Sequence, residues 1–465
     1  MAIFLNSVNT IESALVKCFN SAPEKKIIIA YSGGVDSQVL LVALATLKQR
    51  EQLSNNIVVC HVNHSLSPNA DSWQAFAQQQ CERYSLPLIT RKLQLKKQPQ
   101  QSLEAIARDA RYQVLIQASI EPAFIVTGHH LNDQTETFLL ALKRGSGLKG
   151  LSAMPENSVL AQHNLLRPLL SVSRDEILSY AQQHELSWIE DESNTDEHYD
   201  RNFLRHQIIP ALSERWPSIN KTIARSARHC FEAQQLLNEL AEQDLTVCQT
   251  APDKLSIVKL NSLSEARLKN LLRHFLANHQ LLMPTGQQLA QICQQLNANN
   301  DKSPVIQLAN CCLRRFQHEL YLTHIYQDIS SWQHTIDVDT LATEPSVSVA
   351  LPDQLGAVSI STNSNTSNTD TTWQTAIKQP NVRQLVTIRF GHNNPTCLPE
   401  YRQHSRSLKK VLQELAIPPW QRKRLPFIFY DDELVAVVGH FVCQGYLADN
   451  ADSDYFISWQ SELSF

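Results

Sequence analysis

Residues 25–37 of this chain read KKIIIAYSGGVDS and lead directly into QVLLVALATL at residues 38–47. The isoleucine-rich run predicts a short buried strand, and the apolar run after the turn predicts a helix packed in a core. Gly33 and Gly34 allow a sharp turn between this strand and this helix. The unpaired amides at the helix start then face outward, with the helix dipole behind them. We therefore expect a strand–turn–helix unit that binds a phosphate group.

The first 215 residues continue this alternation of strand and helix. Strands are expected at 26–31, 56–62, 87–91 and 123–127, and helices at 37–47, 71–84, 102–119 and 132–143. Strands at this spacing imply right-handed crossovers, because each helix must return the chain to the start of a parallel neighbour. The pattern predicts an α/β fold, a doubly wound parallel sheet covered on both faces, in a first domain at 1–215.

The rest of the chain changes character twice. A long amphipathic stretch at 219–245 and shorter helices at 263–279 and 286–296 predict a small helical domain at 217–326. Short alternating strands then predict a small α+β domain at 330–465; they are expected at 347–351, 357–361, 385–390 and 434–438. The polar run STNSNTSNTDTT at 361–372 has nothing to bury, so we expect a mobile insertion near 361–375.

Composition excludes several classes of protein. The length of 465 residues allows about three domains, and 43% hydrophobic with 18% charged residues is typical of a globular chain. Neither a membrane span nor a signal peptide is recognisable in the sequence. The ten cysteines are scattered without CxxC spacing, which favours free thiols. We expect a cytoplasmic protein without a membrane partner.

The charge is unevenly distributed along the chain. A formal net charge of −4 argues against a nonspecific nucleic-acid binder, but residues 402–424 hold seven basic side chains and one acid, Glu414. That segment carries +6, which is typical of a protein that holds an anionic partner at one place. Trp420 and the tandem proline before it add a stacking face for RNA. A solvated basic surface with Trp420 in a core is the alternative.

The SGGVDS turn lacks the signatures of two better-known phosphate loops. The turn itself holds neither a GxxxxGK[ST] nor a GxGxxG motif, so no lysine is placed on a terminal phosphate there. Ser32 and Ser37 supply hydroxyl donors instead. A strand-to-helix turn with a serine cap and no ligand is the alternative. On this motif the sequence resembles the PP-loop, or N-type, ATP pyrophosphatase superfamily.

That resemblance implies a particular chemistry. Members hold the pyrophosphate of ATP as a leaving group with Mg²⁺, transfer AMP to a substrate oxygen and then let a nucleophile displace AMP. ATP contacts are implied for the turn and for two positions after neighbouring strands: Ser32, Gly33, Gly34, Val35, Asp36, Ser37, His61 and Gly128. Asp36 would lie near the phosphates and the metal, while the metal ligands themselves stay open.

Two helical motifs of the first domain carry charged residues. EAIARDARY at 104–112 places Glu104 and Arg108 on one helix face, which suits a surface salt bridge as well as a phosphate-facing arginine. TGHHLNDQTET at 127–137 places Asp133 and Glu136 at a helix start beside the carboxyl edge of the sheet. Two carboxylates facing a pocket suit a cationic amine or a metal. Zinc is disfavoured because HExxH is missing.

Together the motifs resemble the tRNA(Ile)-lysidine synthetase family over nearly the whole chain. The matching stretches are SGGVDS at 32–37, HVNHSL at 61–66, EAIARDARY at 104–112, TGHHLNDQTET at 127–137, RGSGLKGL at 144–151, LRPL at 166–169, DESNTD at 191–196 with RNFLR at 201–205, and LKK at 408–410 with PPW at 418–420. The insertion near 361–375 departs from the family pattern.

The resemblance implies ATP-dependent ligation of free L-lysine to C2 of the wobble cytidine of a CAU-anticodon tRNA(Ile). Catalytic roles are implied for Asp36, Arg108, Arg111, Asp133 and Glu136, of which Asp133 and Glu136 would recognise lysine. Contacts with tRNA are implied for Arg201, Arg205, Arg406, Lys409, Lys410, Trp420, Arg422 and Arg424. The oligomeric state stays open, with a homodimer as one option.

Three rival interpretations remain at this stage. A tRNA thiolase of the same superfamily would activate the base identically but deliver sulfur, although CxxC pairs are absent here. A small-molecule PP-loop amidotransferase is the second rival, but such an enzyme would have no function for the basic segment at 402–424. A catalytically idle RNA-binding module would leave the intact turn and the paired acids unexplained.

Overall fold

The structure is a computed structural model that describes most of the chain. The described residues are 2–19, 22–94, 103–296, 305–362, 373–381, 383–448 and 454–460. They form two compact units, Met1–Leu237 and Asn238–Phe465, with the boundary inside the long helix α10 (Ile219–Cys248). The predicted division into three domains stays a prediction. Most of the predicted insertion, residues 363–372, lies outside the described residues.

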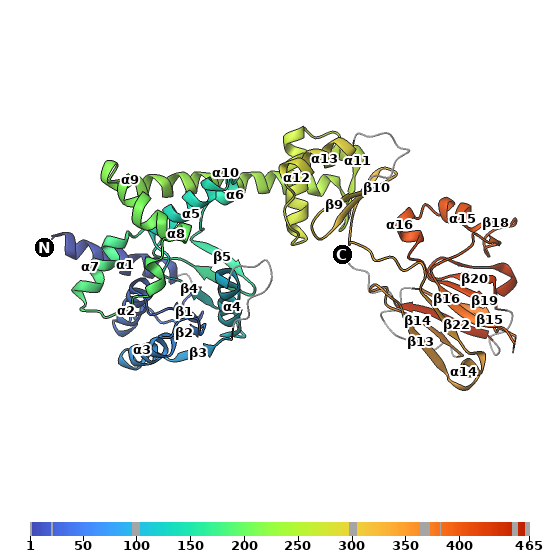
Figure 1. The fold of residues 1–465 in the computed structure, drawn as a ribbon, viewed down its shortest axis with the longest axis horizontal. Helices are drawn as coiled ribbons and strands as arrows, with labels where there is room; N and C mark the ends of the chain where they lie inside the picture. Colours follow the sequence, from blue (N-terminus) through green and yellow to red (C-terminus); the bar gives the residue numbers. More distant parts are fainter. Residues whose placement is uncertain are drawn as a thin grey trace. The chain divides into compact units, whose positions relative to one another are not determined.

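The first unit is built on the predicted parallel sheet (Figure 1). Its strands are β1 (Ile27–Tyr31), β2 (Ile57–Asn63), β3 (Leu88–Lys92), β4 (Phe124–Val126), β5 (Asn157–Leu160) and β6 (His163–Leu166). Their order is β3-β2-β1-β4-β6-β5, and every neighbouring pair is parallel except β5 against β6. The doubly wound fold class is confirmed.

Helices cover both faces of this sheet because alternate residues of β1 point to opposite sides. The helices of this unit are α1 (Ala2–Phe19), α2 (Val35–Gln49), α3 (Ala70–Arg83), α4 (Leu103–Gln117), α5 (Leu131–Lys143), α6 (Leu148–Leu151), α7 (Arg174–Gln183), α8 (Asp200–Phe203) and α9 (Ile209–Arg215). Ile27 and Ile29 pack in one core with residues of α1, α2 and α7, whereas Ile28 packs with residues of α4. The eight strands and helices predicted between 26 and 143 are all present.

The middle part of the chain is not purely helical, which corrects the prediction for 217–326. Helices α11 (Ile257–Leu260), α12 (Glu265–Asn278) and α13 (Gly286–Leu296) pack on a five-stranded antiparallel sheet. The strands are β7 (Gln249–Ala251), β8 (Lys254–Ser256), β9 (Val305–Gln307), β10 (Cys312–Phe316) and β11 (Glu319–Thr323). These strands are only three to five residues long, and so short a run seldom shows an alternating pattern that distinguishes a strand from a loop.

The C-terminal part contains two antiparallel sheets that share one core. The first sheet holds β12 (Gln333–Ile336), β16 (Val386–Arg389), β19 (Phe427–Tyr430), β20 (Glu433–Val437) and β21 (Phe441–Val442). The second holds β13 (Ser346–Ala350), β14 (Ala357–Ser361), β22 (Asp454–Gln460) and β15 (Trp373–Lys378). Ile428 faces this shared core, and its neighbours Phe427 and Phe429 face a second core with α15 (Leu408–Glu414).

Two simpler expectations can also be compared with the structure. All ten cysteines are free, as predicted. No helix in the described part of the chain is both long and apolar enough to cross a membrane.

Candidate active site

The SGGVDS turn joins β1 to α2 and is closed by its own serines. Ser37 Oγ accepts hydrogen bonds from the amides of Ser32 (3.3 Å) and Gly33 (3.1 Å) and donates one to the carbonyl oxygen of Gly34 (2.9 Å). Gly33 has a φ of 90°, and a Cβ there would lie 2.5 Å from Cδ1 of Ile189. The turn therefore requires glycine at this position.

The amides available to an anion are those of the first helical turn. The amides of Ser32 and Gly33, which precede the helix, are not available, because both donate to Ser37. The first bond of α2 runs from Gln38 N to Gly34 O (2.9 Å), and no acceptor for the amides of Val35, Asp36 and Ser37 is found among the described residues. Three such amides at a helix start form an anion-binding position.

Asp36 lies beside the start of α5 because Gly128 permits a close approach. A Cβ at Gly128 would lie 3.0 Å from the carbonyl carbon and oxygen of Asp36. The buried His130 then joins the two elements, with Nε2 3.6 Å from Oδ1 of Asp36 and 3.6 Å from Oδ2 of Asp133. The nucleotide turn and the acidic helix therefore meet at one imidazole.

One carboxylate oxygen of Asp36 suits a metal ion. Its Oδ1 is buried and has no hydrogen-bond partner. Burial raises the pKa of Asp36, against the opposite effects of His130 and of Arg174, whose Nη1 lies 4.0 Å from Oδ2. Mg²⁺ in nucleotide sites is held by one or two carboxylates plus phosphate oxygens, and an orphaned oxygen beside the phosphate turn fits that donor set.

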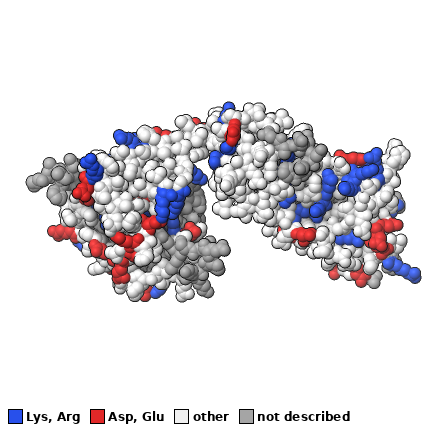
Figure 2. Space-filling model, turned by 45° about the horizontal axis from the view of Figure 1, so that its top comes forward, with Lys and Arg blue, Asp and Glu red and all other residues white. Residues whose placement is uncertain are grey.

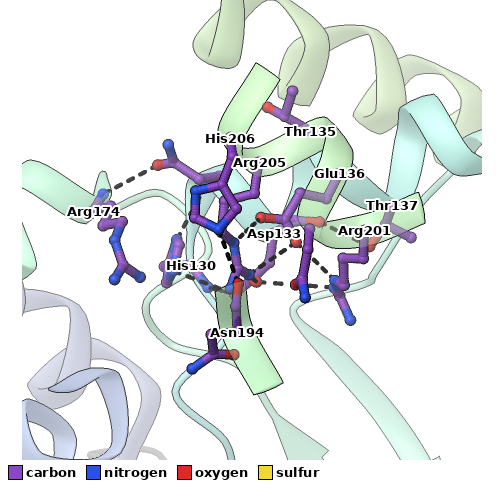
Figure 3. Close-up of polar contacts among 12 residues, drawn as sticks. His130, Asp133, Thr135, Glu136, Thr137, Arg174, Asn194, Arg201, Arg205 and His206 are labelled. Atoms are coloured by element: carbon purple, nitrogen blue, oxygen red, sulfur yellow. Dashed lines mark hydrogen bonds and ion pairs between the residues drawn. The ribbon is translucent and has the colours of Figure 1, made fainter. Parts of the chain in front are cut away.

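Asp133 and Glu136 face two arginines from the segment after residue 199 (Figure 3). Oε2 of Glu136 lies 2.7 Å from Nε of Arg201 and 3.0 Å from Nη2 of Arg205, and Oε1 lies 2.7 Å from Nε of Arg205. Oδ1 of Asp133 lies 3.5 Å from Nη2 of Arg205 and 3.8 Å from Nη2 of Arg201. The two arginines predicted to meet RNA phosphate therefore hold carboxylates in this structure.

Local backbone geometry fixes this arrangement. Asp133 and His130 form a capping box at the start of α5, in which Oδ2 of Asp133 accepts from the amide of His130 (2.9 Å). Arg205 lies in the π-helical turn η2 (Leu204–Ile208) between α8 and α9, and such turns are frequent at functional sites. Burial alone would raise the pKa of Asp133, but His130, His129 and Arg201 hold that pKa below its usual range. Asp133 is therefore a carboxylate at neutral pH.

His61 and the arginines of α4 lie at the same carboxyl edge of the sheet. His61 lies in β2 beside Tyr31, the last residue of β1. Its Nδ1 lies 3.1 Å from the Tyr31 carbonyl oxygen, while its Nε2 is buried without a partner. Burial lowers the pKa of His61, so its ring is neutral. Arg108 and Arg111 flank Tyr112, with guanidinium carbons 5.3 and 5.8 Å from the ring centroid.

The basic segment at 402–424 is less uniform than its sequence suggests. Arg402 and Arg406 both pair with Glu414, and Nη1 of Arg406 lies 2.7 Å from Oε1 of Glu414. Lys409 and Lys410 are exposed on α15. On the face in Figure 2, basic side chains are interspersed with acidic ones rather than merged in one field.

Two other basic residues of the segment, Arg422 and Arg424, make contacts inside the second unit, whereas Lys423 is exposed. Arg424 is buried; it pairs with Asp353 and lies 4.1 Å from the ring centroid of Tyr326. Nε of Arg422 donates to the carbonyl oxygen of Ile417 (2.6 Å). An ion pair and an aromatic ring therefore hold the guanidinium of Arg424, and a backbone carbonyl holds one nitrogen of Arg422. The tRNA contacts of both residues stay a prediction.

Trp420 on α16 (Pro419–Arg422) lies in an aromatic cluster instead of on an open face. It is 8% exposed and packs edge-on against Phe316 and Tyr321, with Arg314 5.6 Å from its ring. We expect Trp420→Ala to lower the free energy of unfolding by about 3 kcal/mol, because a large buried ring is lost. Urea unfolding measures this change. Unchanged stability with weakened tRNA binding would instead favour the stacking role.

Sequence reasoning gave no role to two residues that complete the site. His130 lies within the quoted TGHHLNDQTET motif, but its burial between two carboxylates depends on the approach of α2 to α5. Arg174 begins α7, and the capping box of Ser173 and Glu176 at its start is a signal that the sequence does contain.

A phosphate-binding turn and an acid pair at one edge of a doubly wound sheet define a PP-loop nucleotide-binding enzyme, and the PP-loop domain family matches residues 7–212. Two further families match the second unit: the TilS substrate binding domain at 255–321 and the TilS substrate C-terminal domain at 386–459. The chain belongs to the tRNA(Ile)-lysidine synthase family, as its similarity to named members shows.

Three of these relatives illustrate the extent of the similarity. The tRNA(Ile)-lysidine synthase of Haemophilus influenzae is 41% identical over 92% of this chain and 98% of its own length. That of Pectobacterium atrosepticum is 42% identical over 90% of each chain. That of Vibrio cholerae is 39% identical over 94% of this chain and 96% of its own.

Proposed function

We propose that this chain uses ATP to join free L-lysine to C2 of the wobble cytidine of a CAU-anticodon tRNA(Ile), which converts that base to lysidine. Family membership supports the reaction class. The observation that carries the proposal is the position of His130. Its Nε2 lies 3.6 Å from the carboxylate of Asp36 in the nucleotide turn and 3.6 Å from that of Asp133 in the acidic helix. One edge of the sheet can therefore hold an activated phosphate and a cationic amine together.

The first step transfers AMP to the base. The C2 carbonyl oxygen of cytidine bonds to the α-phosphorus of ATP, and the bond to the β-phosphate oxygen breaks to release pyrophosphate. The amides of Val35, Asp36 and Ser37 are positioned to stabilise the charge on the departing pyrophosphate. Asp36 would hold Mg²⁺ through its buried Oδ1, and the ion would neutralise phosphate charge when bound.

The second step attaches lysine. Its ε-amine bonds to C2 while the bond from C2 to the AMP oxygen breaks. A free lysine amine is protonated at neutral pH, with a reference pKa of about 10.4, so it must first lose a proton. The ionised Asp133 and the buried Glu136 suit an ammonium group, which would compete with Arg201 and Arg205 for their oxygens. Which acid takes which amine stays open.

Exposed cations in the second unit would contact the tRNA body. We expect the double substitution Lys409→Ala and Lys410→Ala to weaken tRNA binding and to reduce the slope of log K against log salt by about 1.5, because each phosphate contact contributes roughly 0.7–0.9. Filter binding across a salt series measures the slope. Removal of two exposed charges from the first unit, Lys17→Ala with Arg83→Ala, is the matched control. An equal slope in both double variants would place the RNA elsewhere.

One assay tests the proposed function against its rivals. The protein is incubated with ATP, labelled lysine and unmodified CAU-anticodon tRNA(Ile), and the RNA is examined for lysine. The expected result is one lysine, one AMP and one pyrophosphate per modified tRNA, and none with a GAU-anticodon control. Sulfur transfer without lysine incorporation would select a thiolase, and tRNA binding without either product an idle module. Sedimentation of the same preparation tests the homodimer.

A further inference from the structure

A second charged group lies at the same edge of the sheet as the acid pair. Arg108 and Arg111 project from α4, Arg167 follows β6, and His129 follows β4. Burial lowers the pKa of Arg111, and the nearby guanidiniums of Arg108 and Arg201 lower that pKa further. Burial likewise lowers the pKa of Arg167, with Arg108 acting in the same direction. These cations are therefore close enough to repel one another.

No ion pair neutralises the three arginines of this group among the residues that the structure describes. Arg108, Arg111 and Arg167 take part in none of the ion pairs of the described chain, unlike Arg201 and Arg205. Arg167 is only 6% exposed. Its Nη1 donates to the carbonyl oxygen of Pro155 (2.8 Å) and to Oγ of Ser158 (3.3 Å), and its side chain also bonds that of Tyr112, but its Nε is buried without a partner. A buried guanidinium with an unused donor is a costly arrangement unless an anion binds there.

Two neutral imidazoles complete this basic group. Burial lowers the pKa of His129 to about 4 against the opposite effect of Asp133, and the nearby arginines, Arg167 first, lower that pKa further. Burial also lowers the pKa of His64 to about 4, with Arg111 and His61 as further causes. The Nδ1 of His64 is buried and has no partner. Neutral rings can donate hydrogen bonds to an anion without adding charge.

Arg201 connects the basic group to the acid pair. It lies close enough to affect the pKa of both Arg111 and His129, and it also bonds Glu136 at 2.7 Å. A free amino acid carries its ammonium and its carboxylate on one carbon, so its binding site needs an anionic and a cationic subsite that adjoin. The sheet edge offers these two subsites on either side of Arg201.

We propose that Arg111 and Arg167, with Arg108 at the exposed rim, bind the α-carboxylate of free lysine while Asp133 and Glu136 receive its ammonium groups. This inference rests on the proposed function and names the second half of its amino-acid site. The pyrophosphate is a poorer occupant, because the charged neighbours of Asp36 at the turn are His130, Arg174, Asp133 and Arg205 and include none of these three arginines. The burial of Arg167 favours a small free anion over an RNA phosphate.

The test compares L-lysine with L-lysinamide, in which a neutral amide replaces the carboxylate and the ε-amine is unchanged. Both are supplied to the full chain with ATP and CAU-anticodon tRNA, and kcat/KM is measured for each. The wild type should prefer lysine by roughly 100-fold, the discrimination expected when buried polar groups lose their partner. Arg167→Met should reduce the preference to a few-fold, and Arg111→Met should do the same if Arg167→Met does not fold.

The ratio of the two nucleophiles on one variant is insensitive to the amount of folded protein, so a merely structural role would leave it unchanged. Arg83→Met, which removes an exposed arginine on α3, should keep the wild-type ratio. An unchanged ratio in both site variants would overturn the inference. A raised KM for tRNA in those variants would then indicate that the arginines bind an RNA phosphate. Lost pyrophosphate release would indicate that they bind ATP. Absence of lysidine in the wild type would overturn the proposed function itself.

Discussion

Asp36→Asn should lower AMP transfer to the tRNA by roughly 1,000-fold, the upper range for loss of one preorganised charge-stabilising group. The substitution keeps the shape of the side chain but removes the negative charge from its buried Oδ1. The carboxylate would then no longer hold the metal that neutralises the phosphates. Pyrophosphate release in the presence of tRNA and the absence of lysine isolates this step from ligation.

The matched control is Asp109→Asn, an exposed carboxylate on α4. Adenylation by this variant should equal that of the wild type, since Asp109 is exposed and does not contribute to the pKa of Asp36. Pyrophosphate release by Asp36→Asn at the rate of the control would contradict the place given to Asp36 beside the phosphates. ATP binding measured separately shows whether the loss lies in affinity or in the chemical step.

The elements of the first unit were predictable because burial and periodicity act locally there. The short isoleucine-rich run IIIAY predicts a buried strand, and the structure confirms it as the central β1 between β2 and β4. The helix after the turn was predicted at 37–47 and runs from Val35 to Gln49, so it is two residues longer at each end. The acid pair, too, lies where a helix start beside the sheet edge was expected.

The pairing of charges was not predictable, because it depends on contacts between distant segments. The family resemblance implied tRNA contacts for Arg201 and Arg205, but no sequence pattern indicated that Glu136, 65 and 69 residues away, bonds both. Arg424 likewise meets Asp353, 71 residues away, inside the second unit. A charge run reveals its own spacing but not the partner that neutralises it.

Asp133→Asn should raise the lysine concentration needed for half-maximal ligation by about tenfold or more, since one charged hydrogen bond contributes roughly 1.5–3 kcal/mol. The amide oxygen of asparagine can still accept from the amide of His130, so the capping box of α5 survives. Only the negative charge offered to an ammonium group is lost. ATP binding and pyrophosphate release should therefore stay near the wild-type values.

Glu136→Gln is the informative contrast, because Glu136 is the main partner of both arginines at 2.7 Å whereas Asp133 is 3.5 Å or more from them. Removing one member of a buried ion pair costs about 3–5 kcal/mol, and partial exposure of the arginines favours the lower end. Glu136→Gln should accordingly lower the unfolding midpoint in urea, and Asp133→Asn should not. If Asp133→Asn changed stability and left the lysine requirement unaltered, its carboxylate would be a structural cap, and lysine recognition would fall to Glu136 alone.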